Sequence, residues 1–501
     1  MFLFSAFNLF YFLCFTLGFI LSYSFYTKKQ KFQIVAAKLP TANGIPFIGI
    51  GYEMIPLKKL FYVLDSYFEK FKSFTFFTWF GTEPFVVTMD PEVIKQVLSS
   101  DDFLSKSKFL YTPIDNALHD GIITSSGNKW RHNRKLMNTL FTHNILTKFM
   151  PIFNNGTKNA VNKLNEFVSQ PEIPIFQILK RIVLQIAIET TMGIEIKDGN
   201  KSDEELVNIF NFILENCAQD ALYSSVHLGF LTHTLKYRRS KKYIRKVVQE
   251  LINVKFQDKR EIKTEQNSET ELPKKSEIFL NQAFAFHERG LFELEDIIIE
   301  TQTMIAGSFE TISTTIYSVL VMLAMHTDVQ EKVYEEILHI CPDENEELTY
   351  EVLQEFHYLD MCLDETLRLM PSIPVIGRNV LVDTKLPNNI HLPKGTQVMI
   401  PIFNLHRRKD IWGAQANEFN PENFSQENAT KRDPFAYIPF SKGSRNCIGW
   451  RYAETALRVL LITLVRNFKF STSFPYKDLE FVDHLSLRYV VEPKIKISLR
   501  E

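Results

Sequence analysis

The sequence predicts a mainly α-helical fold with a small β portion, and three observations support this prediction. Apolar positions recur at helical spacing through most of residues 130–340. The stretch from Leu291 to Met325 is apolar nearly all round, which predicts a long central helix buried on every side. Short strand signals punctuated by Pro and Gly occupy residues 374–403. No linker divides residues 50–501, so we expect them to form a single domain.

The N-terminus predicts a transmembrane helix. Residues 1–27 carry no charged side chain, and a helix of about 20 apolar residues spans a bilayer. Lys28, Lys29 and Lys31 follow, and a basic cluster stays on the cytoplasmic side, so the body should be cytosolic. Residues 28–49 then form a basic, proline-containing connector. A cleaved signal peptide is the alternative, but its apolar region is usually about 7–15 residues behind a basic start.

The other elements are expected in the following order. Residues 81–98 predict a strand, a turn and a helix. Residues 257–276 are the most polar stretch and predict a mobile loop. Residues 450–468 return to helix, with apolar positions at helical spacing.

Composition narrows the function. A net charge of −1 gives no global field, so we expect no nucleic acid partner. Five widely spaced cysteines do not form a secreted disulfide framework and indicate reduced thiols facing the cytosol.

One cysteine has unusual surroundings, in the sequence FSKGSRNCIG at 440–449. Gly443 and Gly449 permit tight turns, and Arg445 is a cation that can pair with an anionic cofactor group. Cys447 lies just before the helix expected at 450–468, whose N-terminal dipole favours a thiolate. A single thiolate is a poor zinc site but suits heme iron. A buried structural cysteine in a turn is the alternative.

This stretch resembles the heme-binding signature of the cytochrome P-450 family, F-x-x-G-x-R-x-C-x-G. The resemblance runs from about Pro40 to the C-terminus and implies the α-rich fold of that family. It also implies heme b (iron protoporphyrin IX) as cofactor, with Cys447 as the axial ligand of its iron and Arg445 beside it.

The sequence AGSFETISTT in the predicted central helix resembles the family pattern A-G-x-[D/E]-T. The resemblance implies that Ala306 and Gly307 leave room for dioxygen beside the heme. It implies that Thr311 and Glu310 are catalytic, with Thr311 holding a water and Glu310 feeding protons inward. The alternative for Thr311 is a structural hydrogen bond to the carbonyl four residues earlier.

Two further residues, in LDETLRLMP, resemble the buried structural ion pair of the family. Glu365 and Arg368 lie three residues apart on one expected helix face. In the family a third residue, usually Arg, joins them from the segment that matches FNPENF. Here that residue is Asn423, which can donate a hydrogen bond but carries no charge, so we expect a weakened triad.

Three residues resemble the family's contacts to the heme propionates. Trp130 and Arg134, in KWRHNRK, match W-x-x-x-R, and Arg378, in PVIGRNV, matches a strand arginine. Indole and guanidinium N–H groups are suitable donors for carboxylates. For His406 a structural role is expected.

The resemblance therefore implies a microsomal heme-thiolate monooxygenase, similar to the clan of fatty-acid ω-hydroxylases and related insect enzymes. Such an enzyme inserts one oxygen atom from O₂ into a lipophilic substrate: a fatty acid, a hormone or a xenobiotic. Its electrons come from NADPH through a diflavin reductase, with cytochrome b5 as a further partner. We expect a single-pass anchor in the endoplasmic reticulum membrane, in contact with membrane lipid. A basic face of Arg131, Lys135, Lys442 and Arg451 could meet an acidic flavodoxin-like partner. The alternative is that these residues are an ordinary solvated rim.

Two other functions stay open from sequence. The first is a heme-dependent peroxide isomerase or dehydratase, which needs no reductase. The second is a non-catalytic heme protein that binds a lipid or hormone.

Overall fold

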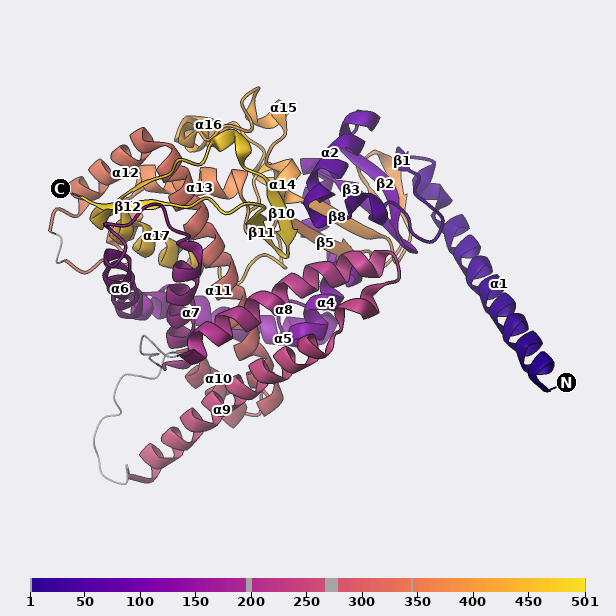
Figure 1. Ribbon diagram of the computed structural model, residues 1–501, viewed down its shortest axis with the longest axis horizontal. Coiled ribbons are helices and arrows are strands. Elements are labelled where there is room, and N and C mark those ends of the chain that lie inside the picture. The colour runs from indigo at the N-terminus through magenta and orange to yellow at the C-terminus, as the bar shows by residue number, and fades with distance from the viewer. Residues whose placement is uncertain (1, 195–200, 266–277, 344–345, 501) are drawn as a thin grey trace.

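The computed structural model describes residues 2–194, 201–265, 278–343 and 346–500. Helices make up most of the body, and a sheet lies near its N-terminal end, from which α1 projects (Figure 1). The predicted fold class, mainly α with a small β portion, is confirmed.

The predicted central helix is α11, Leu294–Met325, which begins three residues later than expected. The side chains of Glu293 and Asp296 close a capping box at its first turn, and most of its residues are buried. Helix α11 packs against α7 (Phe176–Met192) and α17 (Trp450–Asn467). Among the residues that could be searched, α11 alone is long and apolar enough to cross a membrane, but it is the core helix of the body.

The other helices surround α11 or cap the sheet. They are α2 Leu60–Phe71, α3 Pro91–Ser99, α4 Lys108–Leu118, α5 Gly127–Met137, α6 His143–Asn165, α8 Lys201–Ser225, α9 Leu235–Glu265, α10 Phe279–Glu288, α12 Thr327–Ile340, α13 His357–Leu369, and the short α14 Ile402–Leu405, α15 Lys409–Trp412 and α16 Gln426–Thr430.

Six strands form the main sheet in the order β1-β2-β3-β8-β5-β4. Their bounds are β1 Thr41–Ala42, β2 Thr75–Phe80, β3 Glu83–Thr88, β8 Gln397–Pro401, β5 Val375–Asn379 and β4 Ser105–Lys106. The register pairs Arg378 of β5 with Lys106 of β4, which places two cations side by side at this edge. Three two-stranded sheets complete the fold: β6 Thr384–Leu386 with β7 Ile390–Leu392, β9 Phe468–Ser471 with β12 Lys496–Leu499, and β10 Phe481–His484 with β11 Ser486–Tyr489.

The strand, turn and helix predicted at 81–98 are β3 and α3, and the helix predicted at 450–468 is α17. The loop predicted at 257–276 was wrong for 257–265, which continue α9. Charged residues such as Lys and Glu are good helix formers, so polarity alone does not end a helix. Residues 266–277 lie outside the described residues.

Helix α1, Phe2–Ala36, runs through the expected boundary between anchor and connector. Its last turns dock on the body, because Phe32 and Val35 are buried and the Phe32 ring lies 5.8 Å from that of Trp79. Lys28 also pairs with Glu83 at 2.9 Å. The first part of the expected connector, residues 28–36, is therefore a continuation of helix α1.

Candidate active site

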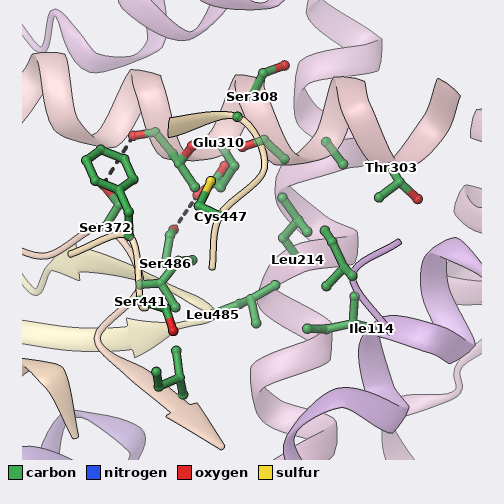
Figure 2. A pocket seen from close by; sticks show the side chains of 18 of the residues that line it. Ile114, Leu214, Thr303, Ser308, Glu310, Ser372, Ser441, Cys447, Leu485 and Ser486 are labelled. Carbon is green, nitrogen blue, oxygen red and sulfur yellow. Dashed lines mark hydrogen bonds between the residues drawn. The ribbon is translucent and has the colours of Figure 1, made fainter. Parts of the chain in front are cut away.

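A cavity of about 400 Å³ lies between α11 and the loop that carries Cys447, and its lining is mostly apolar. Figure 2 shows Cys447 in front of α11, with Ile114 of α4 and Leu214 of α8 pointing into the cavity from the other side. The volume falls in the range of about 300–1,000 Å³ that ligand pockets have.

The Cys447 loop is held by its own backbone. The Cys447 N–H donates to the Phe440 carbonyl at 2.9 Å. Gly443 has φ +73°, and a Cβ there would lie 1.8 Å from the Leu98 carbonyl oxygen, so only glycine fits. Gly449 has φ −93° and needs no such freedom, contrary to our expectation. The Cys447 side chain is accessible from the cavity that it lines.

The start of α17 does not by itself make Cys447 a thiolate. Burial raises the pKa of the Cys447 thiol, and the Gly449 N–H, Arg134 and Lys106 lower it by less. Coordination to a metal cation deprotonates a thiol outright. The metal ion of a bound cofactor would therefore stabilise the Cys447 thiolate, which the start of α17 does not do by itself.

Four cations gather at one side of the cavity: Lys106, Arg134, Arg378 and Arg445. Burial lowers the pKa of each, that of Arg445 to about 9, and Arg378 lowers the pKa values of both Lys106 and Arg445 further. Their described hydrogen-bond and ion-pair partners include no carboxylate. The positive charges of such a cluster repel one another, and a bound anion reduces this repulsion. The two propionates of heme are anions that could bind here.

Neutral groups fix these cations in place. Arg445 donates to the Ser125 carbonyl at 2.8 Å and stacks 4.4 Å from the ring of Trp130. Arg134 donates to the backbone and side-chain oxygens of Asn446, at 2.7 and 2.6 Å.

Arg378 donates to Ser441 Oγ at 3.3 Å, and Lys106 to the Tyr111 hydroxyl at 3.3 Å. Sequence reasoning found the three arginines and Trp130 but missed Lys106, because a lysine in a two-residue strand carries no local signal.

The α11 wall brings Ala306, Gly307, Glu310 and Thr311 to the cavity. A Cβ added to Gly307 would meet nothing within 4 Å, so the protein's own packing does not require glycine there. Thr311 Oγ1 donates to the Gly307 carbonyl at 2.8 Å, the structural bond that we considered as its alternative role.

The spacing in this wall departs from the family pattern. Two residues separate Gly307 from Glu310, whereas A-G-x-[D/E]-T has one. When Glu310 and Thr311 are aligned, Ser308 takes the place of the pattern's glycine and Gly307 that of its alanine. Ser308 Oγ donates to the Met304 carbonyl at 2.8 Å, which leaves that side chain folded back on the helix.

Glu310 lies in a buried ion cluster. Its carboxylate accepts hydrogen bonds from Arg488 and from Ser486, and Lys180 Nζ is 3.9 Å away (Figure 2 shows the bond to Ser486). These donors outweigh burial and lower the pKa of Glu310. Lys180 is itself buried, and burial lowers its pKa to about 8. An ionised Glu310 has no proton to give at neutral pH while these bonds hold.

Glu365 and Arg368 form a fully buried, bidentate pair, with N–O distances of 2.6 and 2.7 Å. The other Arg368 donors bond three backbone carbonyls, those of His406, Ala416 and Glu418. His406 Nε2 accepts from the Ile438 N–H at 3.0 Å, and burial lowers the pKa of His406 to about 3, so the ring is neutral, as its expected structural role requires.

Asn423 keeps the hydrogen bond of the triad without the charge. Its Nδ2 donates to Glu365 Oε1 at 3.1 Å. Arg432 stacks on Trp412 at 3.7 Å, and Arg368 lies 4.8 Å from the same ring. Arg432 also donates to the Asn423 carbonyl at 2.8 Å, and Glu365 raises its pKa against the effect of burial. Arg432 therefore brings a positive charge near Glu365 that sequence reasoning missed.

Replacing Arg432 with glutamine should lower the free energy of unfolding by about 1–2 kcal/mol, through loss of the ring stacking and of a charged donor. The measurement is the urea midpoint of the heme-loaded protein. Lys431→Gln is the matched control, since Lys431 is exposed and pairs with Glu427. Equal urea midpoints for the two variants would show that Arg432 does not stabilise the fold more than an exposed lysine does.

Comparison with known proteins identifies the family of this chain. The sequence model of the family described as Cytochrome P450 matches residues 39–497. Probable cytochrome P450 313a2 of Drosophila melanogaster is 35% identical over 96% of this chain and 97% of its own length. Probable cytochrome P450 313a4 of the same fly is 32% identical over 96% and 98%. Cytochrome P450 4c21 of Blattella germanica is 29% identical over 91% and 92%. The motif-based resemblance is confirmed, and the chain belongs to the cytochrome P450 family of heme-dependent, oxygen-incorporating oxidoreductases.

Proposed function

We propose that this cytochrome P450 is a membrane-anchored monooxygenase that oxidises a lipophilic substrate with electrons from NADPH, delivered by a diflavin reductase. Cys447 would bind the heme iron, and Lys106, Arg134, Arg378 and Arg445 would neutralise the propionates. When bound, the heme supplies the binding and reductive activation of O₂. The observation that carries the proposal is an accessible thiol facing an apolar cavity beside four cationic side chains. Arg378 and Arg445 are buried, Lys106 and Arg134 are half-buried, and the described hydrogen bonds and ion pairs of the four include no carboxylate.

The cavity supports a lipophilic substrate. Its walls are formed by aliphatic and aromatic side chains from α4, α8 and α11, with Leu485 of the C-terminal hairpin beside them. An apolar substrate gains about 25 cal/mol per Å² buried in such a site. Excluding water also strengthens every electrostatic contact within the cavity.

A basic face supports the reductase as partner, with cytochrome b5 as an alternative donor. Arg131, Lys135 and Arg451 are exposed and Lys442 is partly exposed. The bonds from Arg134 to Asn446 tie α5 to the Cys447 loop, so these residues surround the loop that would carry the iron. Complementary charge chiefly accelerates the encounter with an acidic partner.

Two apolar surfaces support location at the endoplasmic reticulum membrane. Helix α1 exposes Phe12, Phe15 and Phe19, at 67%, 76% and 64%. Phe230, between α8 and α9, and Leu235, the first residue of α9, are 69% and 71% exposed. Hydrophobic residues in such numbers on a protein surface mark a membrane or partner contact.

The test uses the full chain, reconstituted with heme and a diflavin reductase in lipid vesicles. With a substrate found by spectral screening, we expect NADPH and O₂ consumption that requires both proteins, and an oxygenated product. Conversion of a lipid hydroperoxide without the reductase would instead identify the isomerase or dehydratase. Tight ligand binding without any turnover in either assay would identify the non-catalytic binding protein.

A further inference from the structure

One carboxylate in the cavity wall has no charged partner among the described residues. Asp483, on β10, lines the cavity, as do its neighbours Leu485 and Ser486, two of the residues drawn in Figure 2. Its Oδ1 accepts a hydrogen bond from the Leu485 N–H at 2.9 Å. No other described bond or ion pair involves the Asp483 side chain, and the side chain is partly accessible.

Each of the other charged groups that line the described cavity either has an ion-pair partner or lies where a heme propionate would bind. Lys106, Arg134 and Arg445 lie on the side of Cys447, where the propionates would neutralise them. Glu310 is held by Arg488 and Lys180. Asp483 differs from all of these, because burial raises its pKa to about 6, the Leu485 N–H lowers it, and no charged side chain contributes. At neutral pH the carboxylate form therefore predominates, uncompensated, in an apolar wall.

The hairpin turn needs only one oxygen acceptor of the Asp483 side chain. Leu485 has φ +71° at the tip of the β10–β11 hairpin, and an Asp or Asn at 483 stabilises such a turn with one oxygen acceptor. Asparagine would serve the turn equally well without a charge. The negative charge of Asp483 thus has no partner among the residues that the structure describes, and burying a charge without a partner costs free energy.

We propose that Asp483 anchors a positively charged group of the substrate, so that the enzyme prefers lipophilic cations such as protonated amines to lipophilic acids. The inference rests on the proposed function and names its substrate class. A cationic head beside Asp483 would supply the missing partner, while the apolar remainder of the molecule fills the cavity toward Cys447. A carboxylate head would meet repulsion there.

The test measures binding to the full-length, heme-loaded protein through the change in heme absorbance, with equilibrium dialysis as a second readout. The ligands are decyltrimethylammonium, its neutral tert-butyl isostere and decanoate. A quaternary ammonium has no lone pair, so it cannot ligate iron directly. We expect the wild type to bind the ammonium about tenfold or more tightly than decanoate.

Asp483→Asn keeps the turn acceptor and removes the charge. It should weaken ammonium binding by about tenfold and change binding of the neutral isostere by less than about twofold. Asp478→Asn, an exposed site that precedes β10, removes the same charge outside the cavity and should change neither affinity. If Asp483→Asn does not retain heme, Asp483→Ser, whose hydroxyl can also accept in the turn, replaces it.

A wild type that binds decanoate as tightly as the ammonium overturns the inference. So does an equal loss for the charged and neutral ligands in Asp483→Asn. Each sample is also checked for the thiolate band of its reduced, carbon monoxide-bound form. A wild type that shows this band but does not prefer the ammonium to decanoate counts against the role of Asp483 alone. A wild type that lacks the band counts against the proposed function.

Discussion

Replacing Glu365 with glutamine is expected to lower the free energy of unfolding by about 3–5 kcal/mol, the usual cost of breaking a buried ion pair from one side. Both side chains of the pair are fully buried, and Arg368 would keep its charge in the absence of its partner. Glutamine has nearly the same shape but presents one acceptor instead of two. The N–H of Asn420 and Nδ2 of Asn423 also donate to Glu365 Oε1, so three groups compete for what remains. The measurement is the urea midpoint of the heme-loaded protein.

The control for this variant is Glu427→Gln. Glu427 pairs with Lys431 at 2.7 Å on the surface, with both side chains largely exposed. Such a pair contributes about 0.3–0.5 kcal/mol, so the control should unfold near the wild-type midpoint. Similar midpoints for Glu365→Gln and Glu427→Gln would mean that Arg432 and the backbone carbonyls compensate Arg368 without Glu365.

Replacing Glu310 with glutamine should have an effect of similar size, about 3–5 kcal/mol, because it removes the buried carboxylate that pairs with both Arg488 and Lys180. Lys180 already has a pKa lowered to about 8, and loss of Glu310 removes the largest effect that opposes its burial. The ammonium should therefore lose its proton near neutral pH. The measurement is the urea midpoint at pH 6.5 and pH 9, where the deficit should be smaller at pH 9 because neutral Lys180 tolerates burial.

Glu295→Gln, on the same helix, is the control. Glu295 pairs with Arg245 at 2.6 Å on the surface, and the expected change is at most about 1 kcal/mol. If Glu310→Gln retained wild-type stability and lost only turnover, the predicted proton-delivery role of Glu310 would be favoured over the structural one.

Structural features that depend on neighbouring residues in the sequence were predictable. The spacing of Gly443, Arg445 and Cys447 is read directly from the chain, and Glu365 and Arg368 are one helical turn apart. The apolar run of α11 likewise predicts burial wherever the helix lies. In each case the physical cause is contained within about ten residues.

Features made by tertiary pairing were not predictable. Arg488 meets Glu310 across 178 positions of the sequence, and β-sheet register alone brings Lys106 to Arg378. Arg432 lies near the Glu365 pair, and its guanidinium group and that of Arg368 both contact the ring of Trp412. Asp483 has no neighbour in sequence that marks it as a wall of the cavity. Spacing along the chain cannot report such contacts.

The helix boundaries likewise depend partly on local sequence and partly on tertiary packing. Lys28, Lys29 and Lys31 indicated where an apolar segment ends, but the helix continues to Ala36 because Phe32 and Val35 have a core to pack against. Residues 257–276 were expected to form a loop, yet helix propensity carries α9 to Glu265.

The most direct measurement is the absorption spectrum of the reduced, carbon monoxide-bound protein, for the wild type and for Cys447→Ser, with Cys341→Ala as a control at a buried cysteine that does not line the cavity. The account predicts the long-wavelength band of thiolate-ligated heme in the wild type and in the control, and its loss in Cys447→Ser. A wild-type protein that holds heme but lacks this band, or a Cys447→Ser variant that retains it, would contradict the assignment of Cys447 as the iron ligand.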